Sequence, residues 1–142
     1  MDRAGDVEAE RDGLAPVREW LAAFAAHVRA VDFESARRMC APELVAFGTV
    51  AYLVEGIDRV MEQQWRHVWP HIRDFTVRME ACRGAVDGGR AWAAVPWDSL
   101  GVRPDGGTFP RRGRFTVVLE RRDGRWLAVH THVSLAPERP GP

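Results

Sequence analysis

The sequence contains no lysine, and its twenty basic side chains other than histidine are all arginines. Twenty acidic residues balance them, so the formal net charge is zero and no long basic block occurs. Binding to a nucleic-acid backbone depends on positive charge, so we expect no nucleic-acid partner. No apolar run approaches the roughly 20 residues that a membrane-spanning helix requires, so we expect no membrane partner either.

Cysteine is scarce as well. Cys40 and Cys82 are the only two, and no metal or redox spacing relates them. The first residues, MDRAGDVEAERDG, are charged and lack the apolar core of a signal peptide. We therefore expect a cytoplasmic protein whose two thiols are reduced.

The length of 142 residues suits one domain with a real core. The two ends, residues 1–13 and 137–142, are short of large apolar residues. We predict that both ends are disordered tails and that the domain spans residues 14–136.

Three helices are predicted in the first half of the chain. An apolar stripe at helical spacing predicts the first, and its members are Val17, Trp20, Leu21, Phe24, Val28 and Val31. Asp32 caps a second helix, which stops before Pro42. The third helix begins after Gly56 and ends or kinks at Pro70.

The later half of the chain reads as strands. A short strand at residues 43–47 precedes the third helix, and alternating apolar residues predict strands over residues 75–86, 91–100, 109–122 and 125–135. Helices followed by an antiparallel meander predict an α+β fold with the helices on one face of a curved sheet.

The last two strands flank Asp123-Gly124, which is a strong signal for a two-residue hairpin turn. In that register Val117 faces His130 and Phe115 faces His132, so both imidazoles share the apolar face. A three-residue loop with a glycine bulge is the alternative, and it places the histidines on a polar face instead. We prefer the first register.

Three features together resemble a known family. They are the strand VAFGT (residues 45–49), Gly56 before a helix that contains Trp65, and the closing hairpin RDGRWLAVHTHVS (residues 122–134). Over roughly residues 14–136 the chain is similar to the SnoaL-like, ketosteroid-isomerase-like group of the nuclear-transport-factor-2-like (NTF2-like) superfamily. The closing hairpin is also similar to the association domain of calcium/calmodulin-dependent kinases.

This resemblance implies a cone: a strongly curved antiparallel sheet wrapped around three N-terminal helices, with a cavity at the open end. It also implies a homodimer through the outer sheet face. The superfamily includes isomerases, dehydratases, hydrolases, cyclases and non-enzymes, so the fold alone does not choose a function. Association domains carry pocket arginines, but the matching positions here are Val117 and Trp97, so we expect an apolar, aromatic cavity with imidazoles.

His130 and His132 are the main catalytic candidates, because a neutral imidazole near pH 7 is a workable general base. Tyr52 is a candidate oxyanion donor. The alternative for each is a supporting hydrogen bond to the backbone, or to Ser134 for the histidines. The residues expected to bind a ligand are Phe24, Trp65, Trp97, Phe115 and Val117.

Other charged and imidazole groups have simpler explanations. His67 and His71 have a possible ligand spacing, but no third ligand is evident, so we predict no metal site. The cluster of Arg111, Arg112 and Arg114 is interpreted as a solvated strand start or as dimer contacts.

The sequence leads to two hypotheses. In the first, the cavity binds a small, largely apolar molecule. If this protein is an enzyme, we expect cofactor-free acid–base chemistry of the isomerase, cyclase or hydrolase type on a carbonyl or hydroxyl compound. In the second, the protein is a non-catalytic ligand-binding or dimeric assembly module with a vestigial cavity. In that case Thr116, Val118, Val129 and Thr131 would form the assembly face.

Overall fold

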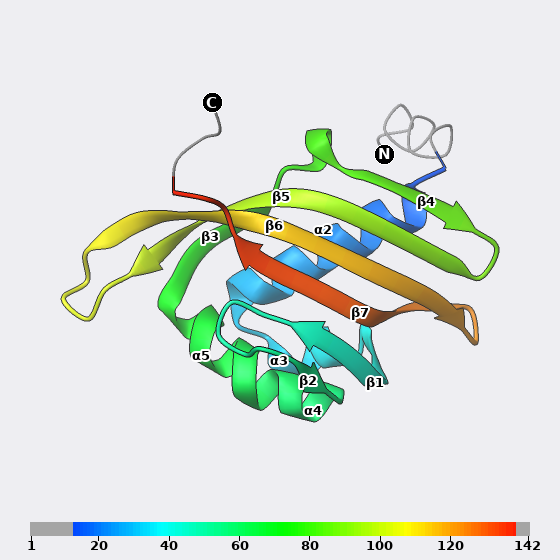
Figure 1. The fold of residues 1–142 in the computed structure, drawn as a ribbon, viewed down its shortest axis with the longest axis horizontal. Helices are drawn as coiled ribbons and strands as arrows, with labels where there is room; N and C mark the ends of the chain where they lie inside the picture. The colour runs from blue at the N-terminus through cyan, green and yellow to red at the C-terminus, as the bar shows by residue number, and fades with distance from the viewer. Residues whose placement is uncertain (1–12, 139–142) are drawn as a thin grey trace.

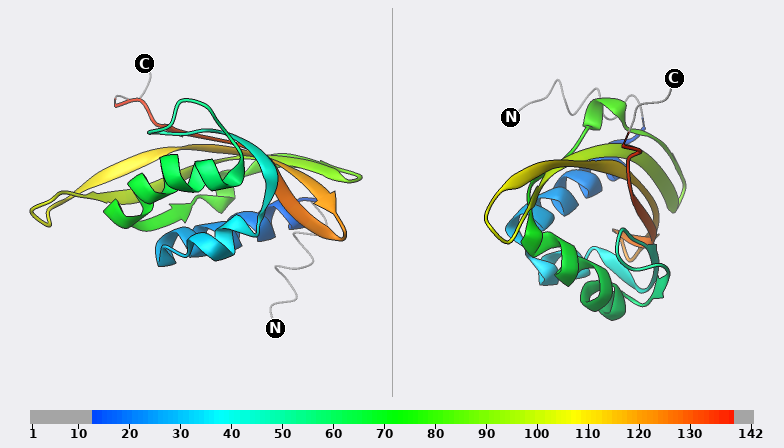
Figure 2. Two further views of the ribbon diagram at one scale, coloured as in Figure 1. Left: turned by 90° about the horizontal axis from the view of Figure 1, so that it is seen from below. Right: turned by 60° about the vertical axis from the view of Figure 1, so that its left-hand side comes forward.

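Helix α2 (Ala15–Ala30) lies in the hollow of a curved sheet, as Figures 1 and 2 show. This computed structural model describes residues 13–138, so the predicted tails lie almost entirely outside the described residues. The helix buries one apolar stripe: Val17, Trp20, Leu21, Phe24, Ala25 and Val28. Val31 ends the helix with φ at 52° and is 37% exposed, so the predicted stripe is confirmed except at its last member.

The second helix, α3 (Phe33–Arg37), begins at the predicted cap. Asp32 Oδ1 accepts a hydrogen bond from the Ser35 amide at 3.1 Å, and its Oδ2 accepts one from Ser35 Oγ at 2.6 Å. These bonds favour the charged carboxylate, so they lower the pKa of Asp32.

The third helical region follows Gly56 and ends with a single turn of 3₁₀ helix at Trp69–His71, which contains Pro70. Its middle is not uniform: α4 (Ile57–Val60) leads into a π-helical segment, Met61–Trp65, before α5 (Arg66–Val68). The extra residue of a π segment changes which side chains face inward, and such segments occur often at functional sites. None of the helices within residues 13–138 has the length and apolar character needed to cross a bilayer.

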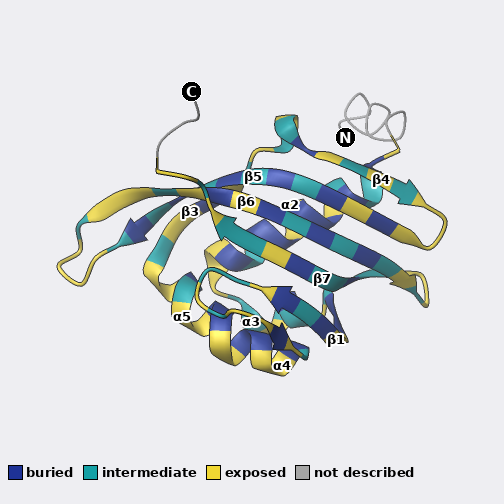
Figure 3. Cartoon of the chain, in the orientation of Figure 1, coloured by how far each residue is buried: buried dark blue, intermediate teal, exposed yellow. Residues whose placement is uncertain are grey.

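In the described residues, seven strands form one sheet in the order β2-β1-β7-β6-β5-β3, with β4 also paired to β5. Their bounds are β1 (Cys40–Phe47), β2 (Val54–Glu55), β3 (Ile72–Val77), β4 (Arg83–Asp87), β5 (Arg90–Val102), β6 (Thr108–Arg122) and β7 (Arg125–Leu135). All pairs are antiparallel except β1 with β7. Burial alternates along the central strands (Figure 3), so one face meets the helices and the other is partly solvated.

The predicted single strand over residues 75–86 is wrong. It is two strands, β3 and β4, separated by a 3₁₀ turn at Met79–Ala81. Val77 pairs with Trp97 and Arg83 pairs with Ala94, so residues 78–82 face only two positions of β5. The surplus residues cannot enter the ladder, and they turn out of the sheet.

The final hairpin has the predicted turn, because Arg122 pairs with Arg125 across Asp123-Gly124. A bulge then shifts the register between Val118 and Leu119, and Val129 has no partner on β6. Beyond the bulge His130 pairs with Val118 and His132 pairs with Thr116. Both predicted registers are therefore wrong past this point, since one extra residue moves every later side chain to the other face.

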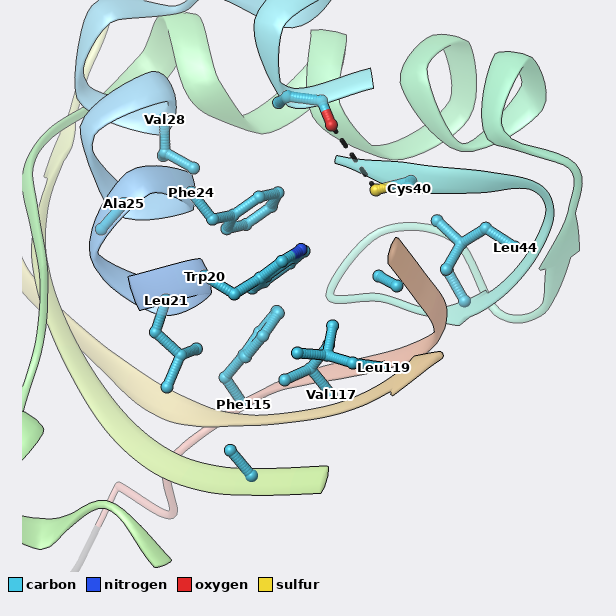
Figure 4. Close-up of a cluster of buried hydrophobic side chains, with 14 of the residues drawn as sticks. Trp20, Leu21, Phe24, Ala25, Val28, Cys40, Leu44, Phe115, Val117 and Leu119 are labelled. Atoms are coloured by element: carbon cyan, nitrogen blue, oxygen red, sulfur yellow. Dashed lines mark hydrogen bonds between the residues drawn. The ribbon is translucent and has the colours of Figure 1, made fainter. Parts of the chain in front are cut away.

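Aromatic rings fill the space between the sheet and α2. Phe24 stacks on Trp20 with centroids 4.8 Å apart and on Phe115 at 5.7 Å, and Figure 4 shows these three rings in a column. Phe24 also meets the edges of Trp65 and Trp69 at 5.8 and 5.7 Å. Rings from α2, from β6 and from the third helical region thus converge on one side chain.

Both cysteines are buried. Cys40 Sγ donates to the Ala36 carbonyl at 3.6 Å (Figure 4). Burial raises the pKa of the Cys40 thiol to about 12, because a thiolate would be poorly solvated there. This thiol is therefore a packing group.

Gly113 provides a sharp test of the packing beneath the sheet. A Cβ at this position would overlap the Trp97 ring and the Ser134 carbonyl, whereas a Cβ at Gly89 would meet nothing within 4 Å. We expect Gly113→Ala to lower the free energy of unfolding by about 2 kcal/mol or more, by overpacking. Gly89→Ala is the matched control and should change it by less than about 1 kcal/mol. Urea unfolding measures both, and equal small effects would contradict the packing described here.

Candidate functional site

A cavity lies at the open end of the cone, between α2, the third helical region and the inner face of the sheet. Its volume is about 40 Å³, counted for the centres of water-sized molecules. A single water needs roughly 10–15 Å³ by this measure, so the cavity suits a compact molecule. The lining is mainly aromatic and aliphatic, and its polar members are Thr49, Gln64, Arg111 and Thr131.

Four of the five predicted ligand-binding residues line this cavity: Phe24, Trp65, Trp97 and Phe115. The fifth, Val117, also points inward but lies deeper in the core and is fully buried. These five residues share the inner side of the cone because helical spacing and strand alternation direct them there.

The predicted catalytic residues lie elsewhere. The bulge at Val129 places His130 and His132 on the outer sheet face, in the same rows as Val118 and Thr116. His130 Nδ1 donates to the Val45 carbonyl at 2.8 Å, so the backbone-bonded alternative describes this residue. The edge-on ring of Phe47 lies 5.1 Å from His130 and 5.3 Å from His132.

Tyr52 is 96% exposed in the loop between β1 and β2, and it is not among the residues that line the cavity. Thr131, predicted on the outer face, is instead buried and lines the cavity, again because of the bulge. The cavity lining, which lies entirely within the described residues, includes no carboxylate, imidazole, thiol or phenol.

Arg111 is the functional candidate that the sequence interpretation missed. It was grouped with Arg112 and Arg114 as a solvated strand start, but only those two are exposed. Arg111 shares its parity on β6 with Gly113 and Phe115, so it faces inward and lines the cavity. The alternation back from Phe115 was the available signal.

The Arg111 guanidinium is half-buried and lies 5.1 Å above the centre of the Trp97 ring. Its Nη2 donates to Thr49 Oγ1 at 3.2 Å. Burial lowers the pKa of Arg111, because removal from water disfavours the charged form. The Ser99 hydroxyl donates to the Arg111 carbonyl at 2.9 Å, which ties the strand at this point.

Gln64 organises the mouth of the cavity from the π-helical segment. Its Oε1 accepts the amides of Val50 and Ala51 at 2.9 and 2.8 Å, and its Nε2 donates to Thr49 Oγ1 at 2.9 Å. A Cβ at Gly48 would overlap the Gln64 amide, so only glycine allows this approach. The loop that carries Thr49 is therefore held by one buried side chain.

The indole Nε1 of Trp97 is buried and has no hydrogen-bond partner among the described residues. Trp97 is 1% exposed and lines the cavity. An indole nitrogen can only donate, and most buried N–H groups are paired, so this one needs an explanation.

Other charged side chains have structural partners. Asp98 forms an ion pair with Arg78 on the outer side, at 2.5 Å. The Arg121 guanidinium lies 5.6 Å from the centre of the Trp126 ring at the hairpin end, as a cation–π pair. Within residues 13–138 no three His, Cys, Asp or Glu side chains come together as a metal site.

The curved, unclosed sheet and the helix in its hollow define a cone of the NTF2-like class. Residues 17–138 match the SnoaL-like domain family, and the chain belongs to that family. No curated protein matches the sequence. The predicted α+β cone and the family resemblance are thus both confirmed.

Solved structures share this fold at low sequence identity. A ketosteroid isomerase-like protein from Erwinia carotovora atroseptica has a TM-score of 0.73 and 14% identity, over 87% of this chain and 97% of its own. An NTF2-like protein with a cystatin-like fold from Novosphingobium aromaticivorans has a TM-score of 0.71 and 16% identity, over 98% and 94%. The association domain of C. elegans CaMKII has a TM-score of 0.66 and 20% identity, over 89% and 96%. At these identities the likeness is one of fold.

Substitution of Gln64 tests whether it holds the cavity mouth. We expect Gln64→Leu to lower the free energy of unfolding by about 1–3 kcal/mol, because the Val50 and Ala51 amides lose their acceptor. Gln63→Leu, on the exposed neighbour, should change it by less than about 0.5 kcal/mol. Urea unfolding compares the two. A Gln64 variant as stable as the wild type would show that the loop does not depend on these bonds.

Proposed function

We propose that the cavity binds a compact, largely apolar molecule. The observation that carries this proposal is the lining itself: aromatic and aliphatic side chains enclose a space that also contains a few fixed polar groups. Ligand sites in proteins have this composition, with apolar walls for affinity and convergent polar groups for orientation. The small volume limits the ligand to a compact one.

Binding is favoured over turnover by the chemistry of the walls. General acid–base catalysis needs a group that can exchange a proton within hydrogen-bond reach of the substrate. The predicted candidates for that role, His130, His132 and Tyr52, lie outside the cavity lining. The side chains that do line it bind and orient a ligand, so the proposal is for a binding domain.

A cavity-filling substitution tests this proposal. Ala46 is buried on the inner face of β1 and lines the cavity, whereas Ala26 is exposed on α2. Benzamide, a neutral single-ring probe, should bind the wild type and the Ala26→Leu variant with similar affinity. Ala46→Leu should weaken binding at least tenfold, because the added side chain occupies the space.

Titration followed by protein NMR measures these affinities and places the perturbed resonances. The cavity proposal fails if benzamide does not bind the wild type, or if Ala46→Leu leaves its affinity unchanged. Circular dichroism establishes that each variant is folded.

The outer sheet face supports a second function, self-association. One row of paired residues crosses five strands, and it consists of Ala85, Trp92, Val118, His130 and Val45. The next row adds Arg83, Ala94, Thr116, His132 and Phe47. Trp92 is 45% exposed and Phe47 is 37% exposed. Large exposed aromatic side chains in one patch are typical of an interface.

We propose that a second copy of this chain covers this face in a homodimer. A two-fold axis places the same patch on both partners, so the exposed aromatic side chains of the two patches can meet. The fold neighbour named as an association domain supports this proposal.

Charge placed on this face should prevent dimer formation. We expect Trp92→Arg to convert a dimer into a monomer, because the interface would bury two unpaired guanidinium groups. Tyr52→Arg makes the same kind of change at an exposed aromatic outside the patch, and it should leave the mass unchanged. Light scattering coupled to size-exclusion chromatography gives the mass, and a monomeric wild-type protein would contradict the proposal.

A further inference from the structure

We infer that the molecule bound in the cavity carries a carboxylate, and that Arg111, Thr49 and Trp97 recognise it. This inference rests on the proposed function and names the chemical class of its ligand. It follows from three groups of residues that line the cavity: a cation without a counter-charge, a hydroxyl proton and an unpaired indole N–H.

The first donor is the Arg111 guanidinium. In the described residues its side chain contacts the Thr49 hydroxyl and the Trp97 ring, both uncharged. Within residues 13–138 no carboxylate lies within 4.0 Å of it, whereas Arg37 and Arg122, which are also of intermediate exposure, have acidic partners. A partly desolvated cation without a counter-charge is costly, and an anionic ligand would offset that cost.

The second donor is the hydroxyl of Thr49. A threonine oxygen can accept two hydrogen bonds and donate one. Thr49 Oγ1 already accepts hydrogen bonds from Gln64 Nε2 and from Arg111 Nη2. The hydroxyl can therefore form a further hydrogen bond only by donating its proton. A ligand that meets this hydroxyl must therefore accept.

The third donor is Trp97 Nε1, buried and without a partner in the described residues. It belongs to the ring whose face Arg111 covers at 5.1 Å, and this ring lines the cavity. A ligand oxygen at Arg111 would neutralise the charge, and one that reached the N–H would also pair the orphaned donor.

Two side-chain acceptors at the mouth, Gln64 Oε1 and Thr49 Oγ1, are already used. Gln64 Oε1 is occupied by the amides of Val50 and Ala51. The complementary ligand group is thus one that only accepts and carries negative charge, as an ionised carboxylate does. The cavity presents one cation among apolar walls, so a monoanion fits better than a phosphate dianion, whose second charge would be unpaired.

Comparing benzoate with benzamide distinguishes binding of the carboxylate from binding of the ring. The two probes share the ring and differ mainly in charge and in the amide's ability to donate. We expect the wild-type protein to bind benzoate at least tenfold more tightly than benzamide, since hydrogen bonds to charged groups are the stronger kind. Arg111→Gln should weaken benzoate binding more than benzamide binding and so remove this preference. Arg112→Gln is the matched control, on the neighbouring exposed residue, and should keep the preference.

Trp97→Phe removes the indole N–H and should weaken benzoate binding about threefold or more while benzamide changes less. Calorimetric titration at fixed ionic strength measures each affinity, and circular dichroism establishes folding of each variant. Equal affinities for the two probes would overturn the carboxylate inference and leave the cavity proposal standing. A benzoate preference that survives Arg111→Gln would overturn it as well. Failure of both probes to bind the wild type would overturn the inference together with the cavity proposal.

Discussion

The convergence of aromatic rings on Phe24 is the constraint on which the cone depends. Phe24 contacts Trp20 on its own helix, Phe115 on β6, and Trp65 and Trp69 in the third helical region, with all centroids between 4.8 and 5.8 Å. Each such pair contributes about 0.5–1.5 kcal/mol beyond the burial of its area. The sheet must curve over α2 for β6 to reach this point. The rings fill the middle of the cone, and the space left at its open end is the cavity.

Local signals predicted most of the elements. The spacing of Val17, Trp20 and Phe24 is a property of one helix. Asp32 caps the next helix, α3, through Ser35, which is three positions along the chain. The Asp123-Gly124 turn is equally local, and it is where predicted. The bulge at Val129 is different, because it depends on how β7 fits between β6 and the parallel strand β1. One unpaired residue there moved both histidines out of the cone, and nothing in the hairpin sequence distinguishes that register.

The site was predictable in part. Strand alternation and helical spacing placed Phe24, Trp65, Trp97 and Phe115 around the cavity. The same alternation places Arg111 inward. A charged residue near a strand end is usually solvated, however, so the sequence favoured an exposed Arg111. Gln64 and Thr49 meet because a π-helical segment turns one side chain toward a loop that only Gly48 lets it approach. That arrangement has no sequence signature, because it depends on the packed positions of two distant segments.

The identity of Arg111 is difficult to explain by stability alone. The strand is held there by its backbone, through the ladder to Ser99 and the Ser99 hydroxyl on the Arg111 carbonyl, and neither needs a guanidinium. An apolar side chain would fill the same space without desolvating a charge. The fold therefore accepts a cost at the point where Trp97 also leaves a buried donor unpaired. Costs of this kind persist where they serve function. The desolvated guanidinium and the unpaired indole N–H both belong to residues of one cavity wall. The bulge directs the imidazoles outward, so the polar groups left at this cavity wall are hydrogen-bond donors. The histidines lie instead on the outer face, beside the exposed aromatic side chains.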